Sequence, residues 1–178
     1  MIIVSHHLLH TTKVKFPKDR VVMRINVAWI REKKELIDLL KKIKHDIYLD
    51  YPQGRSKPPR PTLTLNEVIE LIPLYKNIKH FAISNVEDPK AIAVIKSQLP
   101  KSINLIPKIE TKKGIETLGK IIDSISAKHI MLDKEDLYID INRDHKLFED
   151  LIDLARKTCK SKNTTVLELQ GVVFAPHK

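Results

Sequence analysis

Several residue types that support specialised structures are scarce in this sequence. Its 178 residues include four glycines and a single cysteine, Cys159, and aromatic residues make up 5% of the chain. One cysteine excludes an internal disulfide framework and a paired-cysteine metal or redox site, and it favours a reducing compartment. No apolar run approaches the roughly 18 residues of a membrane span, and no signal peptide is visible at the start. The sequence therefore predicts a cytoplasmic protein without a membrane partner.

The charge of the chain is strongly positive, but charge alone does not identify a partner. Lys and Arg number 32 and Asp and Glu number 22, which gives a net charge of +10. Such a charge suits a polyanion, a membrane surface or a small anionic substrate. The basic residues are spread along the chain, and the few aromatic side chains supply a poor platform for base stacking. These features disfavour nucleic acid, and a nucleic-acid-binding domain remains the weakest alternative.

Chain length and hydrophobic pattern together predict one α/β domain that covers residues 1–178. The hydrophobic content of 42% is sufficient for a buried core. Short apolar runs alternate with longer amphipathic segments, which is typical of helices packed around a mostly parallel sheet. We expect strands at residues 21–26, 46–50, 80–84, 103–110, 129–133 and 165–169, with a weaker one at 2–4. We expect helices at residues 31–44, 65–75, 89–99, 113–126 and 145–160.

Serial strand–helix units of this kind close either as an open doubly wound sheet or as a (β/α) barrel. Eight complete units usually need about 200 residues or more, and the stretch between residues 4 and 21 is short for a crossover helix. An incomplete or compressed barrel of about six to eight strands therefore has to be considered. Residues 171–175 are a candidate further strand, and a second subunit in a homo-oligomer is an alternative cover for an open edge.

Polar residues gather where the expected strands end, which is where parallel α/β folds place their functional groups. An unpaired polar group in a buried strand costs about 1–3 kcal/mol, so polar ends on six strands indicate a site. These residues are Arg24, Asn26, Asp50, Ser84, Asn85, Lys108, Glu110, those of segment 133–136, Glu168 and Gln170.

Lys108 and Glu110 form the sharpest local feature of this set. One residue separates them on an expected strand, so both side chains point to the same face. The pair is either an ion-paired strand end or a cation beside a metal-binding carboxylate. Asp136 comes at the end of the next expected strand, and adjacent parallel strands would bring its carboxylate close to that of Glu110. Two carboxylates with several waters suit Mg²⁺ or Mn²⁺.

Trp29 and the N-terminal histidines each allow a functional and a structural interpretation. Trp29 follows the strand at residues 21–26, where it either covers the pocket or packs in the core. His6, His7 and His10 cluster near the N-terminus, and the spacing of His7 and His10 would suit a metal only on a helix. Because no carboxylate accompanies these histidines, we interpret them as incidental and not as ligands.

Four segments resemble the phosphoenolpyruvate/pyruvate barrels, a superfamily that includes pyruvate kinase, the citrate lyase β subunit and the class II hydroxyketoacid aldolases. Arg24-x-Asn26 is similar to a strand shared by pyruvate kinase and citrate lyase β, and residues 48–54 resemble the pyruvate kinase strand that ends in Asp with a Gly soon after. Residues 106–118 resemble the Lys-Ile-Glu-x-x-x-Gly segment of pyruvate kinase, and residues 130–137 resemble the metal strand that follows it. The order and spacing of the four segments carry the resemblance, which spans roughly residues 20–170.

The resemblance implies a (β/α) barrel of the pyruvate kinase type and a role for each matching residue. Glu110 and Asp136 would hold Mg²⁺ or Mn²⁺, and Lys108 would be the catalytic cation that stabilises an enolate. An enolate oxygen is well served by a metal and a fixed cation directed at the same atom. The substrate would be a small anionic oxoacid, and its binding residues would be Arg24, which also has a catalytic role, Asn26, Asp50 and Gln170.

Departures from the family pattern leave two functions open. The chain has no room for the inserted and C-terminal domains of pyruvate kinase, so a complete pyruvate kinase is not expected. Asp133-Lys134-Glu135 stands where the family has Ala-Arg-Gly, and the threonine expected to deliver a proton has no clear match. We expect a metal-dependent enzyme of the lyase or aldolase type that acts on a 2-oxoacid or its enolate. The alternative is a catalytically degenerate barrel that serves as a binding or regulatory subunit.

Overall fold

A curled parallel sheet forms the centre of the molecule. The structure, a computed structural model, describes residues 2–8, 21–54 and 58–168. In these residues, seven parallel strands lie in one sheet in the order in which they occur along the chain. They are β1 (Ile2–Ser5), β2 (Val21–Asn26), β3 (Asp46–Tyr51), β4 (Ile78–Ile83), β5 (Asn104–Ile109), β6 (His129–Leu132) and β7 (Thr165–Glu168).

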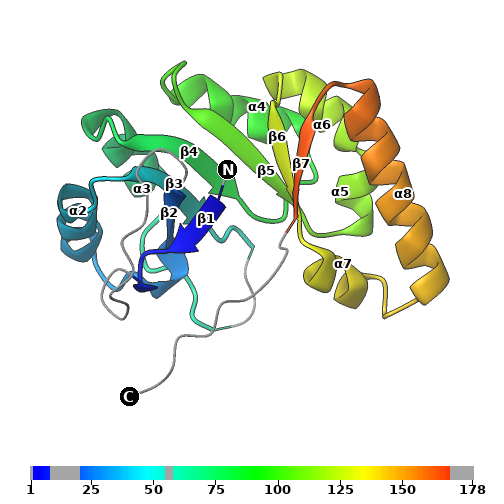
Figure 1. Cartoon of the computed structure of the whole chain (residues 1–178), viewed down its shortest axis with the longest axis horizontal. Helices are drawn as coiled ribbons and strands as arrows, with labels where there is room; N and C mark the ends of the chain where they lie inside the picture. The colour runs from blue at the N-terminus through cyan, green and yellow to red at the C-terminus, as the bar shows by residue number, and fades with distance from the viewer. Residues whose placement is uncertain (1, 9–20, 55–57, 169–178) are drawn as a thin grey trace.

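Helices cover the outer side of the curled sheet, which makes the fold an incomplete α/β barrel (Figure 1). Among the described residues β1 and β7 end the sheet without pairing to each other, and the candidate strand at residues 171–175 lies outside them. The α-helices are α2 (Lys33–Lys42), α3 (Leu65–Leu71), α4 (Pro89–Gln98), α5 (Lys112–Glu116), α6 (Leu118–Ile125), α7 (Lys134–Asp140) and α8 (His145–Ser161). Two 3₁₀-helices, η1 (Val27–Trp29) and η2 (Ile72–Leu74), follow β2 and α3.

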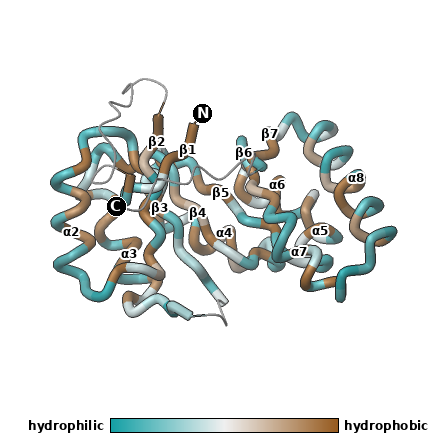
Figure 2. Tube along the Cα trace, turned by 60° about the horizontal axis from the view of Figure 1, so that its bottom comes forward, coloured by the Kyte–Doolittle hydropathy of each residue, from teal (hydrophilic) through white to brown (hydrophobic). Residues whose placement is uncertain are grey.

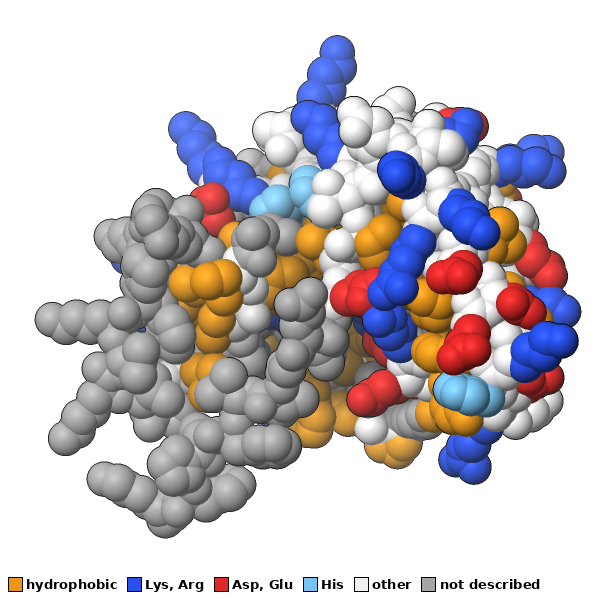
Figure 3. Space-filling view, turned by 45° about the vertical axis from the view of Figure 1, so that its right-hand side comes forward, with side chains coloured by type: hydrophobic (Ala, Val, Ile, Leu, Met, Phe, Trp, Pro, Cys, Tyr) orange, Lys and Arg blue, Asp and Glu red, His pale blue; other side chains and the backbone are white. Residues whose placement is uncertain are grey.

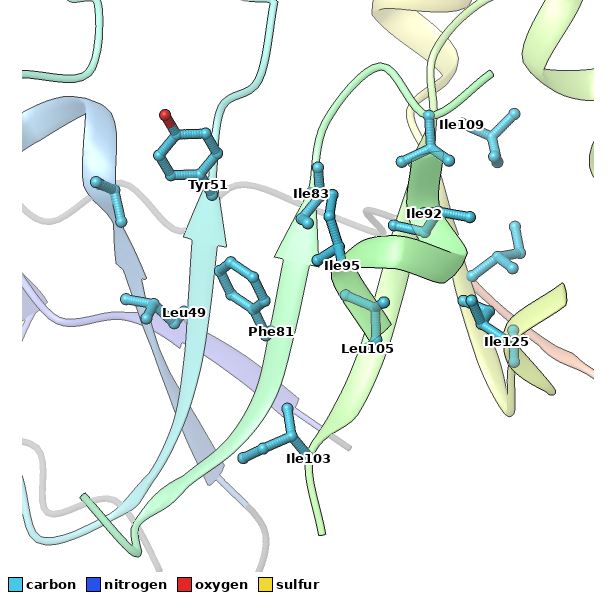
Figure 4. Close-up of a cluster of buried hydrophobic side chains, with 14 of the residues drawn as sticks. Leu49, Tyr51, Phe81, Ile83, Ile92, Ile95, Ile103, Leu105, Ile109 and Ile125 are labelled. Carbon is cyan, nitrogen blue, oxygen red and sulfur yellow. The ribbon is translucent and has the colours of Figure 1, made fainter. Parts of the chain in front are cut away.

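The alternation of side chains along each strand divides the core into two layers. Phe81 and Ile83 of β4 belong to the larger layer and lie in one cluster with Ile92 and Ile95 of α4 (Figure 4). Hydrophobic residues are concentrated on the strands, while much of α8 is hydrophilic (Figure 2). The concave face of the sheet buries a smaller cluster. This smaller cluster contains Val22, Tyr48, Ala82 and Ile106. Full burial of one large apolar side chain contributes about 1.5–3 kcal/mol, so both layers hold the sheet in its curled form.

Side-chain caps set the starts of several helices. Thr64 and Glu67 form a reciprocal capping box, in which the Glu67 amide donates to Thr64 Oγ1 at 3.3 Å and the Thr64 amide donates to Glu67 Oε2 at 2.8 Å. The Leu147 amide donates to Asp144 Oδ1 at 3.0 Å at the start of α8. Each cap is worth about 1 kcal/mol, because it satisfies an amide that has no partner within the helix.

The structure departs from the expected elements on both sides of β6. The helix expected at residues 113–126 is interrupted at Thr117, whose hydroxyl donates to the carbonyls of Glu87 at 2.8 Å and Lys113 at 2.9 Å. The segment after β6, for which no helix was expected, forms α7, and Asp133 caps its start. Asp136 therefore lies in the first turn of a helix and not at the end of a strand, which corrects the sequence prediction.

The described helices and surface also bear on the partners that the sequence leaves open. Within the described residues, every helix falls short of the length and apolar character that a membrane crossing demands. The side of the molecule that carries α8 mixes Lys and Arg with Asp and Glu (Figure 3). That side therefore lacks the contiguous basic surface that a nucleic-acid-binding domain requires.

Candidate active site

A cavity of about 470 Å³ opens at the carboxyl ends of the central strands. It brings together Arg24, Asn26, Asp50, Lys108, Glu110 and Asp136. Gln170, the remaining residue that the sequence predicted for this site, lies outside the described residues. The cavity is also lined by Ser84 and Asp133, which were noted as polar residues at strand ends but were not assigned a role.

Lys108 lines the cavity and is buried. Its Nζ lies 2.8 Å from Glu110 Oε1 and 3.9 Å from Asp50 Oδ1, and it donates a hydrogen bond to Ser84 Oγ at 3.0 Å. The ion pair that the sequence allowed is therefore present, and it stands among further polar groups. Three neighbours from three strands hold the ammonium in one place.

Asp50 connects Lys108 to Arg24. Arg24 Nε donates to Asp50 Oδ2 at 2.8 Å, and Arg24 Nη2 donates to the same oxygen. Asp50 is 1% exposed, and its Oδ1 accepts no hydrogen bond from the described residues. A buried carboxylate oxygen without a donor is costly, so this atom is suited to receive a hydrogen bond from a bound ligand or water.

Burial and neighbouring charges together raise the pKa values of both Lys108 and Glu110. Burial by itself would lower the pKa of Lys108, but the carboxylates of Asp50 and Glu110 outweigh burial and raise it. Burial raises the pKa of Glu110, and the nearby Asp133 and Asp136 add to this effect while Lys108 opposes it. Lys108 is therefore held as an ammonium ion, which suits it to stabilise negative charge and not to attack a carbonyl as a neutral amine.

Three carboxylates meet beside this lysine. One oxygen each of Glu110, Asp133 and Asp136 lie within 4.8 Å of one another. Asp133 follows β6 directly, and its Oδ1 accepts from the Asp136 amide at 3.3 Å, so the cap of α7 places both aspartates on the same side. These all-oxygen donors suit a hard divalent cation such as Mg²⁺ or Mn²⁺.

The sequence prediction of this cluster missed Asp133. Its carboxylate was noted as a polar strand end and as the replacement for an alanine of the resembling family, but not as a metal ligand. The Asp133-x-x-Asp136 spacing, which is typical of an N-cap, was the signal that indicated a helix start and thus a shared position for the two carboxylates.

Two close approaches pack the segment after β5 against the chain that follows β4. The Asn85 amide donates to Glu110 Oε2 at 3.1 Å, and Asn85 itself has a φ of 53°. Gly114, the glycine of the Lys-Ile-Glu-x-x-x-Gly segment, packs so closely that an added Cβ would lie 2.9 Å from the Val86 carbonyl oxygen. Only glycine fits there without displacing the chain that follows β4.

Asn26 and Glu168 play different parts in the structure. The Asn26 Oδ1 accepts from the Ala28 amide at 3.0 Å and caps η1, while the residue also lines the cavity. Glu168 accepts from Lys134 Nζ at 2.6 Å and from Arg156 Nη2 at 3.1 Å, which ties β7 to α7 and α8. Glu168 therefore serves a structural ion-pair network among the described residues.

Comparison with known proteins finds similarity in structure only. No model of a known protein family matches the sequence, and no curated protein matches it. An HpcH/HpaI aldolase/citrate lyase family protein from Burkholderia cenocepacia J2315 superimposes with a TM-score of 0.57 and 11% identity, over 83% of this chain and 70% of that one. An HpcH/HpaI aldolase from Desulfitobacterium hafniense DCB-2 superimposes with a TM-score of 0.62 and 11% identity, over 85% of this chain and 69% of that one. Macrophomate synthase superimposes with a TM-score of 0.61 and 13% identity, over 82% of this chain and 62% of that one.

These structural neighbours belong to the phosphoenolpyruvate/pyruvate barrels that the sequence motifs resemble. The predicted fold, an incomplete (β/α) barrel of this type, is confirmed. This chain spans between 62% and 70% of the length of these three structures. At identities of 11% to 13%, the likeness concerns the fold, and the chemistry has to be argued from the side chains of the cavity.

Proposed function

We propose that this protein is a divalent-metal-dependent lyase or aldolase that acts on a 2-oxoacid or its enolate. The observation that carries the proposal is the buried Lys108 ammonium, fixed beside the carboxylates of Glu110, Asp133 and Asp136. A cation next to an all-oxygen cluster is the arrangement that stabilises charge developing on one substrate oxygen. The names of the structural neighbours, which include two HpcH/HpaI aldolase family proteins, support a reaction of this class.

The donor set fits Mg²⁺ or Mn²⁺. Glu110, Asp133 and Asp136 would hold the ion, because these cations prefer carboxylate oxygens and keep sites for water or substrate. Glu110 has a raised pKa from burial and from neighbouring acids, and a bound cation would favour its ionised form. When bound, the ion supplies Lewis acidity toward a carbonyl or enolate oxygen.

The residues of the chain supply the remaining functions. Cleavage of the bond between C3 and C4 of a 2-oxoacid leaves an electron pair on C3 that is delocalised onto the C2 carbonyl oxygen. Lys108 is positioned to stabilise that negative oxygen, and Asp50 and Ser84 orient the ammonium. Arg24 would bind the substrate carboxylate through Nη1, which makes no hydrogen bond to the described residues.

A catalytically degenerate barrel that binds ligands or partners is the second candidate. Asp133-Lys134-Glu135 occupies the place where the resembling family has Ala-Arg-Gly, so the small residue beside the metal carboxylate is replaced by an acid. The side chain of Glu135 is exposed and is not among the residues that line the cavity. The two candidates differ in whether an oxoacid is turned over, not in whether the metal binds.

Calorimetric titration of the metal-stripped protein with Mg²⁺ and Mn²⁺, with and without pyruvate or oxaloacetate, tests the proposal. We expect metal binding that is strengthened by the oxoacid, and its loss in the Glu110→Gln, Asp136→Asn double variant. The matched control is Glu149→Gln, Asp150→Asn, which removes the same charges from the exposed surface of α8. Absence of metal binding in the unmodified protein, or equal binding by both double variants, would refute the proposed site.

A further inference from the structure

A second cavity of about 380 Å³ lies next to the first, on the side of β1 and β2. We call it the Trp29 cavity, and its lining consists of Ser5, His6, His7, Arg24, Asn26 and Trp29. Arg24 and Asn26 line both cavities, so these side chains form a boundary shared by the two spaces. A ligand that reaches past Arg24 from the first cavity would enter the second.

Aromatic rings form the walls of the Trp29 cavity. Trp29 is 57% exposed, which overturns the interpretation that it packs in the core. The rings of His6 and His7 lie with their centroids 4.0 Å apart and their planes inclined by 36°. An exposed indole and two imidazole rings in the lining of one cavity offer flat surfaces to a planar group.

These rings are held in place by the backbone of β2 and the chain that follows it. The His6 amide donates to the Arg24 carbonyl at 3.0 Å, and His6 Nδ1 lies 3.2 Å from the same oxygen. A carbonyl oxygen only accepts, so Nδ1 carries the proton of this bond. Asn26 caps the 3₁₀-helix that carries Trp29. His6 is buried and held by these contacts, so it has a structural role, and its interpretation as a histidine that binds no metal stays a prediction.

The charges around the Trp29 cavity favour a neutral occupant. Arg24 is the one cationic side chain of permanent charge in its described lining, and two guanidinium nitrogens already bond to Asp50. In the proposed function the third nitrogen, Nη1, binds the substrate carboxylate, so an anionic group in this cavity would compete for Arg24 with both that carboxylate and Asp50. A planar, uncharged group has no such competitor and gains contact with the indole face.

We propose that the Trp29 cavity binds an aromatic ring carried by the carbonyl compound that leaves from, or adds to, the 2-oxoacid. This inference rests on the proposed lyase or aldolase function and names its substrate class, an aryl-substituted 4-hydroxy-2-oxoacid. In the cleavage direction the bond between C3 and C4 breaks, the 4-hydroxyl proton is removed, and C4 becomes the carbonyl carbon of an aryl aldehyde or ketone. C3 keeps the electron pair and takes up a proton to give pyruvate.

Acetophenone and its saturated analogue, cyclohexyl methyl ketone, test this inference, because they differ only in the aromaticity of the ring. Trp29 is the only tryptophan of the chain, so its fluorescence reports directly on this cavity. We expect acetophenone to bind saturably in calorimetry, to change Trp29 fluorescence over the same concentrations, and to bind about tenfold more tightly than the saturated ketone.

Two variants locate the binding. Trp29→Ala is expected to weaken acetophenone binding about tenfold. Leu74→Ala, which removes another exposed apolar side chain, 70% exposed and on η2, is expected to leave it unchanged. Equal binding of the two ketones, quenching without saturation, or the same affinity in Trp29→Ala as in the unmodified protein would overturn the inference.

The titrations are made on metal-free protein and again with Mg²⁺ and pyruvate, so that the two proposals fail separately. Ketone binding without any metal binding would keep the aromatic cavity and refute the lyase or aldolase function. Metal and pyruvate binding without a preference for the aromatic ketone would keep the proposed function and refute the aromatic substrate class.

Discussion

The concave face of the sheet carries polar side chains at both ends of its strands, and the two ends are built differently. At the carboxyl end, Lys108, Asp50 and Glu110 are buried charges. At the amino end, the Asn104 Nδ2 lies 3.1 Å from His80 Nδ1 and 3.0 Å from His129 Nδ1, and the two imidazole rings meet edge to face. An apolar layer that includes Ile106 separates the two ends.

The difference lies in how well each end is satisfied by its own residues. The Asn104 amide nitrogen donates to both histidines and links three side chains of which none is a carboxylate or an ammonium. The carboxyl end holds three acids near one another and leaves Asp50 Oδ1 without a hydrogen bond among the described residues. Buried charges are costly unless paired, so the end that keeps them is the end arranged for a ligand.

The largest effect on stability is expected from a substitution at the charged carboxyl end of the strands. Lys108→Met leaves the buried carboxylates of Asp50 and Glu110 without their common cation, and we expect it to lower the free energy of unfolding by about 3–5 kcal/mol. Urea-induced unfolding measures this change. The control is Lys112→Met, which removes an exposed partner of Glu116 and should lower the same quantity by at most about 1 kcal/mol. Similar losses in both variants would contradict the buried network.

An intermediate effect on stability is expected from a substitution at the amino end of the strands. Asn104→Ala removes the donor shared by His80 and His129 and should lower the free energy of unfolding by about 1–2 kcal/mol. Gln98→Ala, at the exposed end of α4, should change it by less than about 0.5 kcal/mol. Metal affinity in Asn104→Ala should match that of the unmodified protein, because the apolar layer separates the two ends. A shift in metal affinity would show that the ends are coupled.

The smallest effect is the pH dependence of stability that the two histidines at the amino end produce. Burial lowers the pKa values of His80 and His129, and their neighbours His129 and Lys128, respectively, lower them further. The unfolded histidines, with a pKa of about 6.5, bind protons more readily than the folded ones. Stability is therefore fully present above that value, and it falls as the pH drops through it toward the lower folded pKa values.

Urea unfolding between neutral and mildly acidic pH checks this dependence. The His80→Gln, His129→Gln double variant should lose less stability over this range than the unmodified protein does. His145→Gln, at an exposed position in α8, should retain the full dependence. An unchanged slope in the double variant would assign the acid sensitivity to other groups.

Much of the fold follows from local patterns in the sequence. The strand predicted at residues 21–26 coincides with β2, and the helix predicted at 145–160 matches α8 to within one residue. The hydrophobic periods of strands (two residues) and helices (3.6 residues) depend on neighbouring residues, so they can be recognised without the tertiary structure. The break at Thr117 was missed because it depends on a hydrogen bond to Glu87, thirty residues earlier in the chain.

The site was predictable in the part that depends on one strand. Lys108 and Glu110 share a face because they are two residues apart on β5 and at its end, which the sequence shows directly. Asp133 was missed because its position depends on where β6 ends and α7 begins. The exposure of Trp29 was undecided because an indole after a strand fits either a core or a rim.

The sequence by itself determined the alternation of strands and helices, the polar ends of the strands and the pairing of Lys108 with Glu110, since each depends on residues that are close along the chain. Only the tertiary structure decided that Asp133 joins Glu110 and Asp136, that Asp50 links Lys108 to Arg24, and that Trp29 opens a second cavity beside the first. The register between strands and the first turn of α7 set these distances, and both are products of packing between segments far apart in sequence.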